Sequence, residues 1–155
     1  MNIETLREYL FVFSKEGYSR DPGTKNQDGS MTIHHVSEDK EWSIVDTYWG
    51  GEPYAGCETV CYKGKPAWSM VYYGTVHTSI DDVKKVYGHL RNALSNTDET
   101  FPLRGPLIFE EGDMKYANNW HGDLTIFNGE ERILNKGTEV YTASYMGGLV
   151  NQRDE

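Results

Sequence analysis

Two glutamates, Glu58 and Glu131, occupy equivalent positions in two similar stretches of the chain. Both lie in segments where apolar residues alternate, which predicts that each carboxylate sits on a largely apolar strand face. Such a carboxylate must be hydrogen-bonded, ion-paired or placed beside a cavity, because an unpaired buried charge is costly. A matched pair would suit binding of a cationic or hydroxylated ligand, or acid–base catalysis. The structural alternative is that each glutamate bonds a cross-strand Ser or Thr, or pairs with Arg104 or a lysine.

The pairing of the glutamates depends on an alignment of residues 56–76 with 129–149, which needs no gap. Identical residues fall at Gly56/Gly129, Glu58/Glu131, Lys63/Lys136, Gly64/Gly137, Tyr72/Tyr145 and Gly74/Gly147. We therefore expect an internal duplication, with repeat units of about 1–78 and 79–150 inside a single domain of 1–155. The alternative is that two hairpins became similar independently in an aromatic-rich sheet protein.

A helix is expected to precede each of the two stretches. Apolar residues recur at helical spacing in 3–16 and 80–95, with Ser79 as the N-cap of the second helix and Asp82 completing a capping-box-like pattern. Further strands are predicted at 31–38, 42–49, 107–111 and 114–119, with loops at 20–30 and 96–106. The fold class is therefore α+β, with two tandem α-β-β-β-β units. The two helices would pack on a curved antiparallel sheet with pseudo-two-fold symmetry, because so few helices do not fit a parallel sheet.

The turns of the two hairpins determine which side chains share a face. The repeated Lys-Gly pairs are predicted two-residue turns, in which glycine supplies a positive φ. This register puts Glu58 opposite Ser69 and, in the second copy, Glu131 opposite Thr142, with Tyr73 on the same face. A three-residue turn would break it. The glycine two positions before each glutamate is expected to form a bulge that redirects the strand.

Other candidate residues lie outside the hairpins. Asp46, Tyr48 and Trp49 end a strand beside a Gly-Gly turn, where they would line a pocket mouth or pack as ordinary strand-end residues. Arg104 lies in the stiff loop PLRGP, which suits either a structural partner for a buried carboxylate or an anion contact. The full set of predicted ligand-binding residues is Glu58, Glu131, Trp49, Tyr48, Ser69, Tyr73, Thr142 and Arg104.

Composition limits the partners that we expect. A net charge of −9 opposes direct nucleic-acid binding, and we expect neither a signal peptide nor a membrane span. We expect a cytoplasmic protein. Cys57 and Cys61 lie four apart in a predicted strand, too far for a disulfide, and should be free thiols. The histidines show no metal-ligand spacing, so neither a metal nor a cofactor is expected.

Several short motifs together resemble an uncharacterised bacterial domain family of unknown function. They are the run Asp46-Thr-Tyr-Trp-Gly, Gly56-x-Glu58, Ala67-Trp68-Ser-Met70 followed by Tyr72-x-Gly74, the PLRGP loop, and the closing Tyr145-Met-Gly-Gly148. Members of that family occur alone or fused behind helix-turn-helix (XRE-type) regulators, and the resemblance spans nearly the whole chain. By looser analogy, duplicated effector-binding modules of regulators hold cationic drugs with an acidic residue in an aromatic pocket. Glu58 and Glu131 would suit that role.

The favoured function from the sequence is a non-enzymatic sensor domain that binds a small cationic or aromatic molecule between its halves. One alternative is a small hydrolase or isomerase that uses Glu58 and Glu131 as acid and base. Another is a protein-interaction module that forms a homodimer through an exposed aromatic face or a sheet edge.

Overall fold

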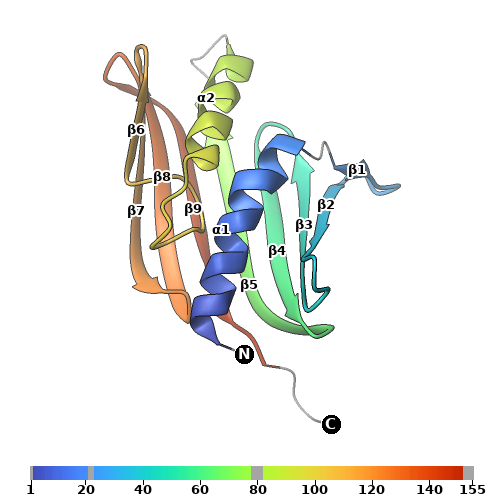
Figure 1. Cartoon of the computed structure of the whole chain (residues 1–155). Coiled ribbons are helices and arrows are strands. Elements are labelled where there is room, and N and C mark those ends of the chain that lie inside the picture. The colour runs from blue at the N-terminus through green and yellow to red at the C-terminus, as the bar shows by residue number, and fades with distance from the viewer. Residues whose placement is uncertain (1, 21–22, 78–81, 152–155) are drawn as a thin grey trace.

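A computed structural model describes residues 2–20, 23–77 and 82–151, and contains two helices and one antiparallel sheet. The helices are α1 (Ile3–Arg20) and α2 (Val83–Ser95). The strands are β1 (Thr24–Lys25), β2 (Met31–Val36), β3 (Trp42–Gly50), β4 (Tyr54–Tyr62), β5 (Lys65–Val76), β6 (Ile108–Glu111), β7 (Met114–Asp123), β8 (Ile126–Asn135) and β9 (Thr138–Leu149). They form one nine-stranded sheet in the order β1-β2-β3-β4-β5-β9-β8-β7-β6 (Figure 1). The predicted combination of two helices with an antiparallel sheet is confirmed.

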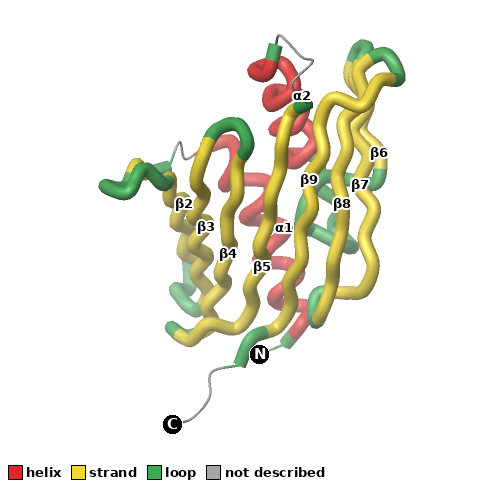
Figure 2. Tube along the Cα trace, turned by 180° about the vertical axis from the view of Figure 1, so that it is seen from behind, coloured by secondary structure: helices red, strands yellow, loops and turns green. Residues whose placement is uncertain are grey.

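Both helices lie against the same face of the sheet, as the front and back views show (Figures 1 and 2). The predicted apolar stripes are the buried ones: α1 buries Leu6, Leu10 and Phe13, and α2 buries Val86, Leu90 and Leu94. Two clusters of buried side chains result. One joins α1 mainly to β2–β5, and the other joins α2 to β7–β9.

The start of α2 differs from the prediction. Asp82 is the N-cap, and its carboxylate accepts a hydrogen bond from the backbone N–H of Lys85 at 3.0 Å, so the helix begins at Val83. The predicted N-cap Ser79 lies outside the described residues. The predicted loop at 20–30 also contains the short strand β1, which pairs with β2.

The two Lys-Gly turns are confirmed, with positive φ at both positions of each pair (50° and 77° at 63–64, 52° and 82° at 136–137). The predicted register behind them is wrong. The pairing shifts at a bulge between Val60 and Cys61, so Glu58 lies opposite Met70 rather than Ser69. The second hairpin has the same irregularity one residue after Ile133. The bulges predicted at Gly56 and Gly129 do not occur in the described pairing. The irregularity of each hairpin lies near its turn instead.

This shift moves both glutamates to the helix-covered face. Glu131 lies opposite Ala143 rather than Thr142. Glu58 and Glu131 are buried, whereas Ser69, Tyr73 and Thr142 lie on the opposite face of the sheet. The expectation that these five residues share one face is therefore wrong, since one extra residue in a strand inverts the side of everything beyond it.

The glycines that precede the glutamates have a packing role. A Cβ on Gly56 would lie 2.2 Å from Tyr72 Oη, and a Cβ on Gly129 would lie 2.3 Å from Tyr145 Oη. Each tyrosine ring therefore lies directly on a bare stretch of backbone in the neighbouring strand. Two smaller observations complete the fold. Cys57 and Cys61 are free thiols, and no helix in the described ranges is long and apolar enough to cross a membrane.

Candidate functional site

A pocket of about 570 Å³ opens between α2 and strands β2 to β5, where the two buried clusters meet. Leu90 and Leu94 of α2 form its apolar wall, and the strands opposite contribute aromatic rings. The tyrosines that line it are Tyr48, Tyr54, Tyr72 and Tyr87. Its innermost polar groups are Asp46 of β3 and Arg104 of the loop between α2 and β6. An apolar cleft with a few convergent polar groups has the usual character of a small-molecule site.

Asp46 is the acidic group of this pocket, and only 2% of its surface is exposed. Tyr72 Oη donates a hydrogen bond to Asp46 Oδ1 at 2.6 Å. Beside this bond, Asp46 lines the pocket together with the tyrosine rings. Burial raises the pKa of Asp46 to about 6, although the Tyr72 hydrogen bond and the charge of Arg104 oppose the rise. The group is therefore mostly ionised at pH 7.

A raised pKa at Asp46 makes stability depend on pH. The ordinary aspartate pKa is about 3.9, so between about pH 4 and pH 6 the native state binds more protons than the unfolded state. Stability is therefore lost as the pH rises through this window. Asp46→Asn has no titrating group at this position. We therefore expect the unfolding free energy of the variant minus that of the wild type to rise by about 2 kcal/mol between about pH 4 and pH 7. Urea unfolding of both proteins at each pH measures the gain, and a constant difference would contradict it.

Arg104 forms the floor of the pocket through an ion pair with Glu131. Its Nε and Nη2 donate to the two carboxylate oxygens of Glu131 at 3.0 and 2.7 Å. Both groups are nearly inaccessible, with 5% of Arg104 and 0% of Glu131 exposed. Burial alone lowers the pKa of Arg104, but the charge of Glu131 raises it well above its ordinary value. The Arg104 guanidinium thus stays charged, and it lies over the Tyr72 ring with Cζ 5.3 Å from the centroid.

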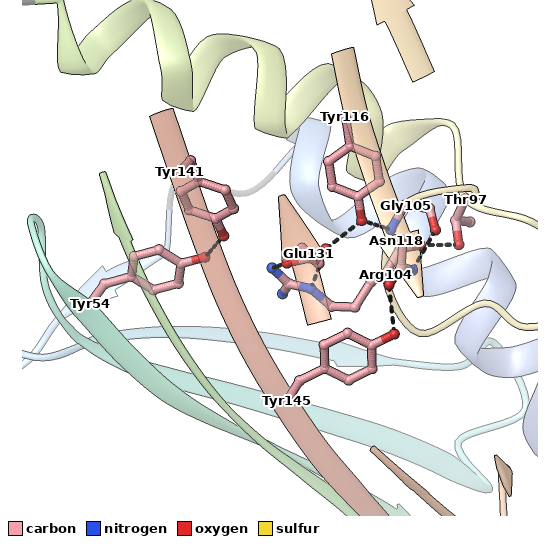
Figure 3. A network of polar contacts seen from close by, with 9 residues as sticks. All are labelled: Tyr54, Thr97, Arg104, Gly105, Tyr116, Asn118, Glu131, Tyr141 and Tyr145. Carbon is pink, nitrogen blue, oxygen red and sulfur yellow. Dashed lines mark hydrogen bonds and ion pairs between the residues drawn. The ribbon is translucent and has the colours of Figure 1, made fainter. Parts of the chain in front are cut away.

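The ion pair is held by further buried hydrogen bonds (Figure 3). Tyr116 Oη donates to Glu131 Oε1 at 2.5 Å and accepts from the backbone N–H of Gly105 at 3.1 Å. Asn118 Nδ2 donates to the Gly105 carbonyl at 3.0 Å. Thr97 Oγ1 donates to the Arg104 carbonyl at 2.5 Å. The loop that carries Arg104 is therefore attached to strands β7 and β8, and charge-assisted bonds of this kind are the strong ones.

Two further tyrosine contacts shape the opening of the pocket. Tyr54 Oη and Tyr141 Oη share a hydrogen bond at 2.5 Å, which joins β4 to β9 (Figure 3). Tyr87 of α2 donates to Glu52, whose other oxygen accepts from Thr75 Oγ1 and from a backbone N–H of β5. Burial is the main cause of a raised pKa at Tyr87, and the hydrogen bond to Glu52 adds to the rise, so the phenol stays neutral.

The structure divides the residues predicted for the site into three groups. Tyr48 and Arg104 line the pocket, and Glu131 bonds Arg104 from behind. Glu58 is buried on β4, directly opposite Asp46 on β3. The remaining four, Trp49, Ser69, Tyr73 and Thr142, lie on the other face of the sheet, so the structure does not bring them to the pocket.

Asp46, Tyr54, Tyr72 and Tyr87 line the pocket but were not in the set predicted for the site. The sequence predicts Asp46 at a pocket mouth. In the structure Asp46 lies opposite Glu58 and is buried on the same face of the sheet. No local pattern distinguishes the three tyrosines from packing residues. Only the docking of α2 over β3–β5 distinguishes a pocket wall from a filled core, and sequence alone does not specify that docking.

A second hollow of about 590 Å³ lies between α2 and the β6–β7 turn. Its walls include the exposed side chains Lys85, Arg91, Asn92 and Asp113. The buried His89 contributes to it, but both ring nitrogens are inaccessible. Solvent therefore competes for the exposed polar groups of this hollow, whereas Asp46 and Arg104 are shielded. For this reason we place the candidate site at the Asp46 pocket.

The fold and the pocket define an α+β domain with a buried acidic group at the base of an aromatic cleft. The chain belongs to the family described as Domain of unknown function (DUF5680), whose model matches residues 46–150. Asp46, Tyr72, Arg104 and Glu131 all lie within the matched range. No curated protein and no solved structure matches the chain significantly.

Proposed function

We propose that this domain is a sensor that binds a small organic cation with an aromatic or apolar body. The observation that carries the proposal is the nearly buried carboxylate of Asp46, which accepts a hydrogen bond from Tyr72 and lines a pocket of tyrosines. An ionised, desolvated carboxylate attracts a cationic nitrogen more strongly than it attracts a neutral group, and tyrosine faces also favour cations. The acidic role expected for Glu58 and Glu131 thus passes to Asp46.

Positive side chains near the pocket do not reverse this preference. Arg104 is neutralised by the bidentate bond to Glu131. Lys84 and Arg91 stand at the mouth and are exposed, where solvent and salt screen their charge. The same ion pair argues against the hydrolase or isomerase alternative, because both oxygens of Glu131 are occupied by Arg104 and are poorly placed for proton transfer.

The test compares three indole compounds of similar size: tryptamine, the neutral indole-3-ethanol and the anionic indole-3-acetate. We expect calorimetry at pH 7 to show tryptamine binding most tightly, and Asp46→Asn to weaken it about tenfold to a hundredfold. Binding of indole-3-ethanol should change little in the variant. Tryptamine affinity should also fall below about pH 6 as Asp46 gains a proton.

The variant has a structural precedent within the same sheet. Asn118 is buried on β7, and its Oδ1 accepts a hydrogen bond from Tyr145 Oη at 2.8 Å. An asparagine at position 46 can hold Tyr72 in the same way, so Asp46→Asn should keep the fold and remove only the charge. Equal affinity for tryptamine and indole-3-ethanol in the wild type, or binding of none of the three, would refute the proposal.

We also infer that the sheet derives from two tandem α-β-β-β-β units related by a pseudo-two-fold axis. The strand order runs outward in opposite directions from the β5–β9 pair, and the aligned tyrosines Tyr72 and Tyr145 lie directly opposite each other in that pair. Each tyrosine covers a glycine and bonds a short polar side chain of β3 or β7. These matched contacts support duplication.

A further inference from the structure

The face of the sheet opposite the helices is bare over its central strands. Neither helix nor any described loop covers it, as the back view shows (Figure 2). Val71, Tyr73 and Met146 expose 50%, 53% and 57% of their surface there. The register places Cys57, Val71 and Met146 side by side across β4, β5 and β9, so these side chains form one continuous surface.

This surface lacks charge. We define the charge-free patch as the outward-facing side chains of residues 43–49, 55–61, 67–75 and 142–148, on β3, β4, β5 and β9. Every one of them is apolar, glycine, cysteine, Ser or Thr, although 25% of the whole chain is charged. Charges return at the next strand, β8, where the outward-facing Glu130 and Arg132 form an exposed ion pair at 3.3 Å. A sheet face that met only solvent would carry charged side chains throughout.

The patch has the dimensions of an interface. Four strands about 4.8 Å apart and about nine residues long, at about 3.3 Å per residue, give a flat footprint of about 570 Å² per copy. Two such footprints reach the total of about 1,000 Å² that a specific protein–protein interface requires.

The chemistry of the patch fits a second copy of itself. Its polar groups include hydroxyls such as that of the exposed Ser144, and a hydroxyl both donates and accepts, so it can pair with its own kind. A lysine or a glutamate side chain cannot pair with its own kind in this way. Two chains of net charge −9 repel elsewhere, and contact between them is least opposed where neither carries charge.

We propose that the charge-free patch is the interface of a homodimer, in which two sheets stack face to face about a two-fold axis. Stacked sheets pack about 10 Å apart, with their side chains interdigitating. The helices and the Asp46 pocket then lie on the outer sides of the dimer and remain open to solvent. This inference does not depend on the identity of the ligand.

Sedimentation of the full chain over a dilution series in the micromolar range tests the proposal. We expect a species of twice the 17.7 kDa chain mass. Val71→Lys places a charge at the centre of the patch and should weaken dimerisation about a hundredfold, because an unpaired ammonium would be buried. Met146→Glu, on the neighbouring strand, should act in the same way.

The matched control is Asn119→Lys, an exposed outward position of β7 beyond the patch, which should leave the dimer unchanged. Val71 is half exposed in the single chain, so its variant should unfold at the temperature of a wild-type monomer and retain its near-ultraviolet circular dichroism. If Val71→Lys fails to fold, Met146→Glu decides the question. A wild type that stays monomeric at every concentration would overturn the proposal, and so would folded variants that dimerise like the wild type.

Discussion

Replacement of Arg104 by leucine is expected to lower the free energy of unfolding by about 3–5 kcal/mol. The substitution leaves the Glu131 carboxylate, which is 0% exposed, without its bidentate partner. Tyr116 Oη still donates one hydrogen bond to it, but one neutral donor does not replace a guanidinium. Urea or thermal unfolding followed by far-ultraviolet circular dichroism measures the loss.

The double variant Arg104→Leu/Glu131→Leu distinguishes the energy of the ion pair from the separate contributions of the two residues. Breaking a buried ion pair is costly because one charge remains unpaired, whereas removing both charges is often close to neutral. We expect the double variant to recover most of the stability lost in the single one. If it proves as unstable as the sum of both single variants, the ion pair does not couple these positions.

A methyl group added at Gly129 should destabilise the protein by about 3 kcal/mol, the upper end of the typical range for overpacking. The new Cβ would lie 2.3 Å from both Cζ and Oη of Tyr145, which is 3% exposed and bonded to Asn118. Because the ring is buried, it can move only by displacing its neighbours. Thermal unfolding of Gly129→Ala measures the effect.

The matched control is Gly88→Ala in α2, where an added Cβ meets nothing within 4 Å. Alanine has a higher helix propensity than glycine, so the free energy of unfolding of this variant should rise by about 0.5–1 kcal/mol. A Gly129→Ala protein as stable as the wild type would show that the Tyr145 ring does not depend on the bare backbone beneath it.

The sequence predicts the elements of this fold better than their register. Both helices and the hairpin turns follow from local signals: apolar spacing in α1 and α2, and Lys-Gly pairs that accept positive φ. The bulge after Val60 has no such signal, because one extra residue beside a turn leaves the alternation on either side intact. This irregularity, which recurs after Ile133, places Glu58 and Glu131 on the face opposite Ser69, Tyr73 and Thr142.

The candidate site is predictable only in part, for a related reason. The sequence indicates that Glu131 must be partnered and offers Arg104 as one partner, and the structure has this ion pair. The importance of Asp46 depends on three elements that are distant in the chain: β3 carries it, β5 supplies Tyr72, and α2 closes the cleft above it. Local patterns describe each element but not how the three meet.

The central strand pair also determines when the molecule can be completed. The two halves of the sheet join through the β5–β9 ladder, and β9 is made well after β5, because it begins at Thr138 whereas β5 ends at Val76. Until then β5 is an uncapped edge, with backbone groups available to any passing strand. Long-range pairings of this kind form slowly, because a large loop must close before any contact rewards it. The strand order therefore makes the joining of the two halves a late, long-range step, and we expect it to be slower than the closing of the hairpins within each half.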